Sequence, residues 1–304
     1  MAFFDVVVQT NHGWFSNQTA PIPPEKRFQL TSDLYLEKLD SKASNIVLDF
    51  GIPAGYEVMK PFKQYAQFYA FVRQIPEPAN IHEWDSDQRL QTVVALSRLV
   101  RPTSISFRHA ARLHYGNDGT LKSAYPAWLT GMDPDSWLAP EQTYRDWLIE
   151  VEMEQLRALL NGSSLSALPV RLSRAFWYHE YTSRTYYGEF RWITVCVALE
   201  SMLHTSRGYS TRQFVERLPL MALILGIPLN PQEAETAYDM RSRLSHGGAT
   251  GKLAQSDEQL YKKLELVLRT ALKEAILNPM FAAIFVDENT IRSKWPIVIG
   301  KKSV

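Results

Sequence analysis

The sequence is poor in cysteine and contains no long uninterrupted apolar run. Its single cysteine, Cys196, cannot form an intramolecular disulfide, which excludes a disulfide-stapled fold and a cysteine-rich metal site. The longest apolar stretch, residues 218–229, is interrupted by Pro219, Gly226 and Pro228 and is shorter than the roughly 20 residues that a membrane-spanning helix needs. We therefore expect no association with a membrane.

The sequence also lacks an excess of charge of one sign. With 33 basic and 32 acidic residues the formal net charge is +1, so any site for a polyanion must be local. The N-terminus has no basic stretch ahead of its apolar residues and no small-residue cleavage site, which is unlike a signal peptide. Together with the single cysteine, these features predict a cytoplasmic protein.

What the sequence does contain is enough apolar residues for a sizeable core. Its 304 residues are 45% hydrophobic and 21% charged, which is ordinary usage for a globular protein of about two domains. Most of the 17 prolines lie before residue 141, and beyond it apolar residues recur with a helical period. We therefore predict an α+β domain over residues 1–140 and a helical domain over residues 141–304.

The expected elements follow from local patterns. In the first half, short apolar or alternating segments predict strands over residues 4–9, 44–50 and 104–113. Gly116 to Gly119 predicts a turn into another strand, and residues 86–100 predict a helix that ends before a proline. In the second half, amphipathic segments predict helices over residues 141–160, 165–182, 190–204, 210–225, 230–246 and 256–277. The predicted class is mainly α, with an antiparallel helical bundle after the α+β domain.

Most motifs that carry chemistry are missing or incomplete. The segment from Gly247 to Lys252 contains the glycines and the lysine of a phosphate loop, but the glycines are too close together and Leu253 replaces Ser or Thr. The pair His179-Glu180 stands in an aromatic segment that should be largely buried, where a histidine satisfied by a neighbour is the favoured interpretation. No metal or cofactor site is expected.

The segment Arg241-Ser242-Arg243-Leu244-Ser245-His246 is a stronger candidate. Its Arg-x4-His spacing does not identify a functional site by itself, because Arg174 and His179 have the same spacing. Its position at the end of a polar helix does matter, since the helix dipole there stabilises a protonated imidazole close to solvent. The alternative is that the segment has only a structural role. In that case His246 caps free carbonyl groups at the helix end, and Arg241 pairs with one of three carboxylates: Glu235, Asp239 or Glu200.

Two stretches of the helical half together resemble a known family. One is the apolar segment Ala198-Leu-Glu-Ser-Met-Leu203, and the other is Tyr238-x-x-Arg-Ser-x-x-x-His-Gly247, after an intervening helix. Their order and spacing resemble the ApeA-like branch of the HEPN superfamily. The resemblance is specific over residues 188–248 and extends over about residues 141–280.

This resemblance implies a metal-independent endoribonuclease that acts as a toxin or antiphage defence effector. It implies a HEPN-type bundle that forms a homodimer, RNA as the substrate, an antitoxin or trigger ligand as a further partner, and no cofactor. Arg241 and His246 would form the active site, with Ser242 behind the arginine and Glu200 as the orienting carboxylate. The chain departs from the wider superfamily by having Ser at 242, where Asn, Asp or His is frequent.

The residue types suit RNA cleavage without a metal. RNA carries its own nucleophile, the 2′-OH, so an enzyme needs a group that moves protons, here His246, and a cation for the phosphorane, here Arg241. The planar guanidinium contacts two phosphate oxygens at once. Five residues of helix turn through about 500°, which leaves the two side chains roughly 140° apart. We therefore expect a two-fold dimer to form one composite cleft and the monomer to be inactive.

Further candidates and two other functions stay open. Arg243 is expected to bind the RNA backbone or to form an ion pair, and Tyr238 is expected to pack beside the active-site arginine. A basic cluster contains Arg207, Arg212 and Arg217.

The chain could alternatively be a non-catalytic HEPN-like module that binds nucleic acid or protein, or a hydrolase that uses the first half, where no nucleophile and base stand out. In the leading interpretation the first half senses a signal or selects the substrate.

Overall fold

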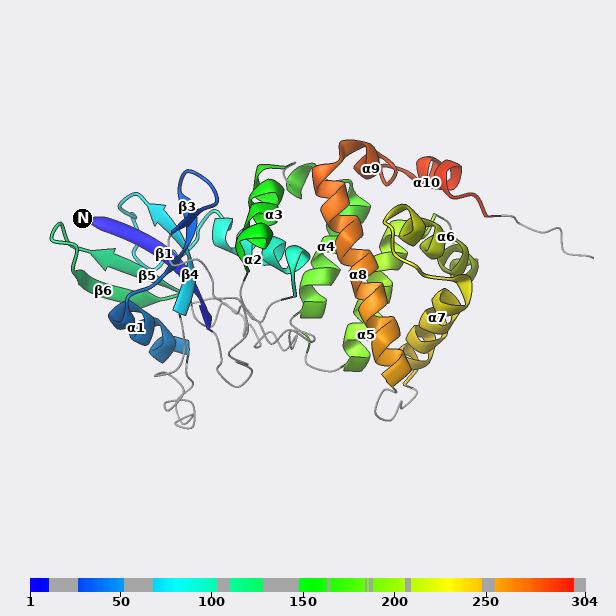
Figure 1. Cartoon of the computed structure of the whole chain (residues 1–304), viewed down its shortest axis with the longest axis horizontal. Coiled ribbons are helices and arrows are strands. Elements are labelled where there is room, and N and C mark those ends of the chain that lie inside the picture. Colours follow the sequence, from blue (N-terminus) through cyan, green and yellow to red (C-terminus); the bar gives the residue numbers. More distant parts are fainter. Residues whose placement is uncertain are drawn as a thin grey trace, which may run out of the picture. The chain divides into compact units, whose positions relative to one another are not determined.

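The chain divides into two compact units, Met1–Asn161 and Gly162–Val304, each with its own core (Figure 1). The structure is a computed structural model, and it describes residues 1–10, 27–51, 68–102, 110–127, 148–162, 165–183, 185, 188–205, 209–247 and 255–297. Within these residues the first unit has a six-stranded sheet with three helices, and the second unit is helical. A mainly helical chain with an α+β first part is therefore confirmed. The predicted domain boundary at 140/141 lies outside the described residues.

The sheet of the first unit is antiparallel throughout, with strand order β2-β3-β4-β1-β5-β6. The strands are β1 (Ala2–Thr10), β2 (Phe28–Gln29), β3 (Leu34–Lys38), β4 (Phe68–Ile75), β5 (Ala110–Tyr115) and β6 (Leu121–Pro126). Val6, Val7 and Val8 of the interior strand β1 are completely buried, although successive side chains point to opposite faces. Both faces of this part of the sheet are therefore covered.

Helix α1 (Ser41–Gly51) replaces the strand predicted over residues 44–50, and that prediction is wrong. Asp40 accepts a hydrogen bond from the Ala43 N–H at 2.8 Å and so caps the start of the helix. Ala43 and Val47, one turn apart, are buried in a core that includes Val8 of the sheet. A short apolar run fits a strand and a buried helix equally well, and here the capping aspartate decides.

Most of the other elements predicted for the first unit are present. The strand over residues 4–9 and the helix over residues 86–100 correspond to β1 and α2 (Arg89–Val100). The glycine turn is present, since the Gly119 N–H donates to the Gly116 carbonyl at 3.0 Å and Gly119 has a φ of 71°, which favours glycine. The strand predicted over residues 104–113 is described only from Ala110, where β5 begins. Strands β2, β3 and β4 were not predicted.

A buried ion pair anchors the connection between β4 and α2. Asp5 of β1 accepts from the Nε of Arg112 at 2.6 Å and from its Nη2 at 2.8 Å, and both side chains are at most 3% exposed. The other Arg112 N–H groups donate to the carbonyls of Asn80, Ile81 and Glu83. Asp5 also accepts from the Asp85 N–H at 2.9 Å, and Asp85 accepts from the first N–H groups of α2.

Helix α3 (Glu150–Asn161) belongs to the first unit, whereas the sequence analysis assigned it to the helical domain. Arg157 of α3 lies over the ring of Phe28 at 5.3 Å, and Glu152 lies 3.7 Å from Arg101 at the end of α2. The predicted helix over residues 141–160 is described only from residue 148. Periodicity identified this helix, but it carries no information on which core the helix joins.

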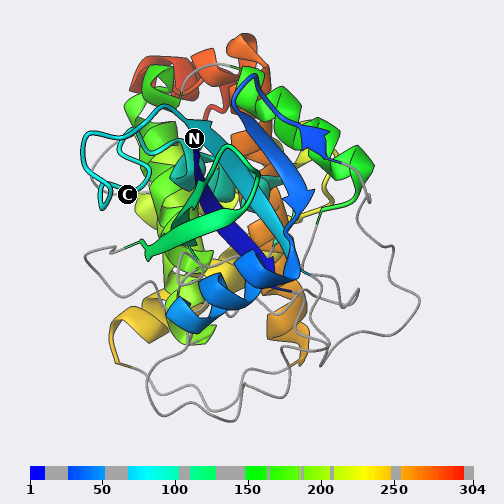
Figure 2. The same cartoon turned by 90° about the vertical axis from the view of Figure 1, so that its left-hand side faces the viewer.

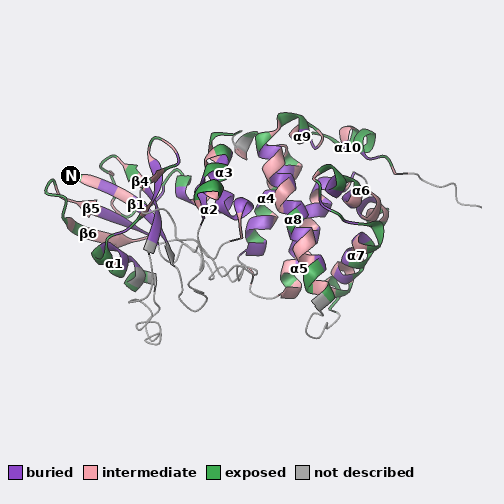
Figure 3. Cartoon of the chain, viewed as in Figure 1, coloured by how far each residue is buried: buried purple, intermediate pink, exposed green. Residues whose placement is uncertain are grey.

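The second unit is built around α5 (Gly188–Leu203), which packs against α4, α6, α7 and α8. The remaining elements are the 3-10 turn η4 (Leu165–Ala167), α4 (Val170–Ser183), α6 (Ser210–Ile224), α7 (Pro231–Ser245), α8 (Gln255–Leu277), α9 (Pro279–Ala283) and α10 (Glu288–Lys294). The neighbours that α5 has on most sides explain why it is apolar almost all round, with Trp192, Cys196 and Leu199 completely buried. Figure 3 colours the chain by burial and shows that each unit has buried residues of its own. The buried free Cys196 was expected, and burial raises the pKa of its thiol.

Helix α7 shows most clearly how the sequence sets helix boundaries. The Asn230 side chain accepts from the Glu233 N–H and the Glu233 carboxylate accepts from the Asn230 N–H, both at 2.9 Å, which forms a capping box. Gly247, with a φ of 76°, follows the last turn, as the Gly-Gly stop predicted.

The five predicted helices from residue 165 onward correspond to α4 to α8, while α9 and α10 were not predicted. In the described part of the chain, no helix has the length and apolarity to cross a membrane.

Candidate functional site

The packing of α7 on α5 brings Glu200 to Arg241. Trp192, Cys196 and Glu200 are each four residues apart and share one face of α5. The Trp192 indole N–H donates to the Ala237 carbonyl of α7 at 3.1 Å, and the Cys196 thiol contacts the same carbonyl at 3.8 Å. One turn further along both helices, Nη2 of Arg241 donates to Oε2 of Glu200 at 3.1 Å.

This ion pair is half-buried and unequally exposed. The Glu200 side chain is 11% exposed and the Arg241 side chain is 26% exposed. Burial raises the pKa of Glu200, and the charge and hydrogen bond of Arg241 oppose that rise. Oε1 of Glu200 and Nε of Arg241 are buried without a hydrogen-bond partner among the described residues. Of the three carboxylates considered for Arg241, Glu200 is the one it pairs with, and the arginine side chain keeps part of its surface open to solvent.

His246 lies at the C-cap of α7 and is exposed. Its main-chain N–H donates to the carbonyls of Ser242 and Arg243, both at 3.2 Å. Its imidazole is therefore at an open helix end, where the sequence analysis placed it. Among the described residues, no hydrogen bond or ion pair joins the side chains of Arg241 and His246, because the arginine turns toward α5.

The three other residues predicted for this site lie on the same helix. The Arg241 guanidinium lies 5.8 Å from the centre of the Tyr238 ring, which in turn contacts the Phe214 ring at 5.5 Å, so Tyr238 packs as expected. Ser242 is half-buried beside Arg241, and Arg243 is exposed, with its Nη2 3.3 Å from the Met240 sulfur. The ion pair considered for Arg243 is not formed within the described residues.

The predicted basic cluster is wrong for Arg217, which is buried. Its Nη1 donates to the Leu203 carbonyl at 2.6 Å, and its Nε donates to the Trp295 carbonyl at 3.0 Å. Arg212 pairs with Glu216, and Arg207 lies outside the described residues. Arginines gather here because the last carbonyls of α5 have no partner within the helix and carry the negative end of its dipole.

Two more arginines serve the same helix end. Arg292 donates to the Thr205 carbonyl at 2.7 Å, and Arg171 donates to the carbonyls of Ser201 and His204. Arg171 and Arg292 also each bind Glu288 of α10. These arginines therefore tie α4 and α10 to the C-terminal end of α5.

His204 directly follows α5, one turn after Glu200, and was not among the predicted site residues. Burial lowers its pKa to about 4, and the nearby positive charges of Arg241, Arg217 and Arg171 act in the same direction. The imidazole is therefore neutral near pH 7, and its Nε2 is buried without a hydrogen-bond partner among the described residues. The Glu-x3-His spacing was the available signal, since it places both side chains on one face of the helix.

His179 has the structural role that was favoured for it. Its Nε2 lies 3.5 Å from Oε1 of Glu265 on α8, and both side chains are buried. Arg269 also binds Glu265, at 3.1 Å. Burial alone would raise the pKa of Glu265, but Arg269 and His179 together lower it.

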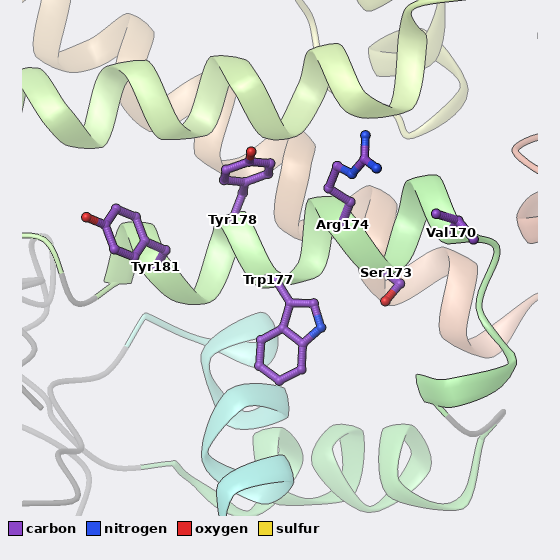
Figure 4. A pocket seen from close by; sticks show the side chains of 6 residues that line it. All are labelled: Val170, Ser173, Arg174, Trp177, Tyr178 and Tyr181. Carbon is purple, nitrogen blue, oxygen red and sulfur yellow. The ribbon is translucent and has the colours of Figure 1, made fainter. Parts of the chain in front are cut away.

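The expectation that the aromatic segment from Arg174 to His179 is largely buried is wrong for Trp177. Trp177 is 61% exposed, as is Tyr181 one turn further along α4 at 60%, whereas Phe176 and His179 are buried. A hollow of about 530 Å³ follows the outer face of α4, and Figure 4 shows the side chains that line it: Val170, Ser173, Arg174, Trp177, Tyr178 and Tyr181. The helix is thus amphipathic with aromatic residues on both faces, which composition alone does not reveal.

The chain has no significant match to any protein-family model, to any curated protein or to any solved structure. Within the residues that the structure describes, no group of three or more His, Cys, Asp and Glu side chains is arranged to hold a metal ion. The functional argument therefore rests on the side chains of α5 and α7 and on the sequence pattern that they carry.

Proposed function

We propose that the protein is a metal-independent endoribonuclease of HEPN type that cleaves RNA in the cytoplasm as a toxin or antiphage defence effector. The observation that supports this proposal is the pair formed by Glu200 and Arg241. The carboxylate on α5 holds Arg241, whose side chain is 26% exposed, and His246 is exposed at the end of the helix that carries the arginine.

Each side chain has a chemical role in this proposal. His246 accepts the proton of the RNA 2′-OH, whose oxygen attacks the adjacent phosphorus. Arg241 binds the phosphate oxygens as negative charge grows on them, and Glu200 fixes the direction of the guanidinium. The bond from phosphorus to the 5′-oxygen breaks, that oxygen takes up a proton, and the products carry a 2′,3′-cyclic phosphate and a 5′-OH.

The proposal includes a homodimer. In one chain Arg241 faces α5, and five residues of helix separate it from His246 by roughly 140° around the axis of α7. A two-fold axis at the ends of two α7 helices places Arg241 of each chain with His246 of the other around one cleft. An antitoxin or a trigger ligand is the remaining partner in this proposal.

The test compares cleavage of cellular RNA by the wild type and by matched variants, with EDTA present. We expect His246→Ala and Arg241→Ala each to lower the cleavage rate by about 100-fold or more, the usual cost of losing a proton-transfer group or an oxyanion cation. His82→Ala is the control, because His82 is an exposed histidine of the first unit. Equal rates for the wild type and His246→Ala would contradict the proposal.

A specific observation also fits the non-catalytic alternative. A half-buried Glu200–Arg241 pair stabilises the packing of α5 on α7 whether or not RNA is cleaved. In that case the wild type binds RNA or protein without cutting it, and Arg241→Ala lowers stability alone. Measuring the unfolding midpoint beside the cleavage rate distinguishes the two functions, because catalysis by His246 predicts a variant that is stable but inactive.

A further inference from the structure

Two large aromatic side chains of the helical unit are exposed on α4. Trp177 is 61% exposed and Tyr181 is 60% exposed, whereas Tyr35 of the sheet unit is only 3% exposed. Tyr35 is buried together with residues of α1, the helix that crosses one face of the sheet in Figure 2. Burial of a large ring is favourable, so neighbouring rings that remain in water are typical of a binding surface.

The two rings share the outer face of α4 with an arginine. At about 100° per residue, the side chains of Arg174, Trp177 and Tyr181 lie within roughly 60° of one another around the helix axis. All three line the hollow of about 530 Å³ that Figure 4 shows. Leu172 and Phe176, on the opposite face of the helix, are buried. The packing that holds α4 in its unit therefore leaves the outer face open.

The charge of this face is positive. Helix α4 has one carboxylate, that of Glu180, and it is buried. Of its two arginines, Arg171 is paired with Glu288, whereas Arg174 is exposed and forms no ion pair with another described residue. The described residues that line the hollow include no Asp or Glu. A guanidinium beside aromatic rings, without a competing carboxylate, is complementary to a polyanion that also presents flat rings.

The two rings are free to stack on a ligand. The Phe176 ring meets the Trp177 ring nearly edge-on, at 5.7 Å between the ring centres and with the planes 75° apart, so it covers at most one face of the indole. Within the described chain, Tyr181 contacts no other aromatic ring. Bases of a single strand stack on such rings, whereas the bases of a duplex are already stacked on one another.

We propose that the outer face of α4 binds single-stranded RNA, with bases stacked on Trp177 and Tyr181 and a phosphate group bound by Arg174. The chain has a net charge of only +1, so a polyanion must bind where positive charge is local, as it is here. The inference rests on the proposed function for the identity of the polyanion. It adds a contact with RNA away from Arg241 and His246 but in the same unit, because α4 and α7 both pack on α5.

The test measures binding of the full chain to a short single-stranded RNA in which every 2′-OH is methylated, by fluorescence anisotropy of an end label. We expect Trp177→Ala and Tyr181→Ala each to weaken binding about five-fold or more, the usual loss when a base loses its stacking partner. Tyr181→Phe keeps the ring and should bind like the wild type. Tyr209→Ala is the matched control, because Tyr209 is 58% exposed in the same unit but lies outside α4.

The same assay tests the charge and the need for a single strand. Arg174→Gln should weaken binding and reduce the slope of log affinity against log salt by about 0.7, the value for one phosphate contact on a single strand. Lys294→Gln, at an exposed lysine of α10, is the control and should leave the slope unchanged. Competition by a duplex of the same sequence that equals competition by the single strand would overturn the stacking of bases.

Wild-type affinity in both ring-deleting variants would overturn the proposed location. A wild type that does not bind the methylated RNA would overturn the proposal altogether, and a change from dimer to monomer in Trp177→Ala, measured by light scattering, would then assign the face to a second copy of the chain. Failure of the proposed ribonuclease is a separate result, because cleavage is measured on unmethylated RNA. A wild type that binds RNA through α4 without cleaving it contradicts the ribonuclease and supports this site.

Discussion

At the scale of single residues, the environment of each group determines its chemistry more than its position in a motif. Glu200 lies in the last turn of α5 and His204 directly follows that helix, yet burial raises the pKa of the carboxyl group and lowers that of the imidazole. The motif predicted the pairing of Glu200 with a cation. It could not predict that His204 would be neutral, because that depends first on burial in the folded chain and then on the charges of Arg241, Arg217 and Arg171 from other helices.

Glu200 makes stability depend on pH in a defined direction. Its pKa is raised in the folded protein, so the folded state holds a proton more tightly than the unfolded chain does. The free energy of unfolding that Glu200 contributes is therefore largest at low pH and falls as the pH rises through the folded-state pKa. We expect Glu200→Gln to remove this decrease, measured by urea unfolding of both proteins across pH. A wild type that gains stability relative to Glu200→Gln as the pH rises would contradict the assignment.

His204 should have the opposite effect. Its pKa falls from 6.5 to about 4 on folding, so between these values the unfolded chain binds more protons. The wild type should lose stability as the pH falls from 6.5 toward 4, and His204→Gln should lose less. The same urea titrations measure this, with His82→Gln, at an exposed histidine, as the control. Parallel curves for wild type and His204→Gln would show that His204 is not buried as a neutral group.

At the scale of elements, caps and turns were predictable and long-range pairing was not. The Asn230-Pro231 start and the Gly247 stop of α7 are local signals that need no tertiary context. Asp40 is also a local signal, but the apolar run beyond it resembles a strand as much as the helix α1 that it forms. Strand β4 was missed because it is recognised by its pairing with β1 and β3, far away in the sequence.

The capping box gives a direct prediction for α7. Asn230→Ala removes the side-chain acceptor of the Glu233 N–H, and we expect it to lower the free energy of unfolding by about 1 kcal/mol. Gln232→Ala, at an exposed position in the first turn of the same helix, is the control and should change stability by less than about 0.5 kcal/mol. If both variants unfold at the same urea concentration, Asn230 does not cap the helix.

At the scale of the whole molecule, the chain consists of two units that each bury their own core. The change in proline content along the sequence indicated a division, but the contacts of α3 place it at Asn161 and Gly162. The helical unit carries the residues of the proposed ribonuclease.

Independent cores predict separate unfolding events. Arg112→Met leaves the buried carboxylate of Asp5 without its partner, which we expect to cost the first unit about 3–5 kcal/mol. In a calorimetric scan this variant should shift the transition of the sheet unit to lower temperature and leave that of the helical unit in place. Cys196→Ser, which changes the core of α5, should do the reverse. A single transition that both variants shift equally would contradict independent cores.

The central claim, that Arg241 and His246 cleave RNA through its own 2′-OH, is tested most directly by a pair of RNAs that differ only at that group. One is an ordinary oligoribonucleotide, and the other has the same sequence with every 2′-OH methylated. Mass spectrometry of the products formed by the protein in EDTA should show 2′,3′-cyclic phosphate ends from the first RNA and no cleavage of the second. Cleavage of the methylated RNA, or products with 5′-phosphate ends, would contradict the account.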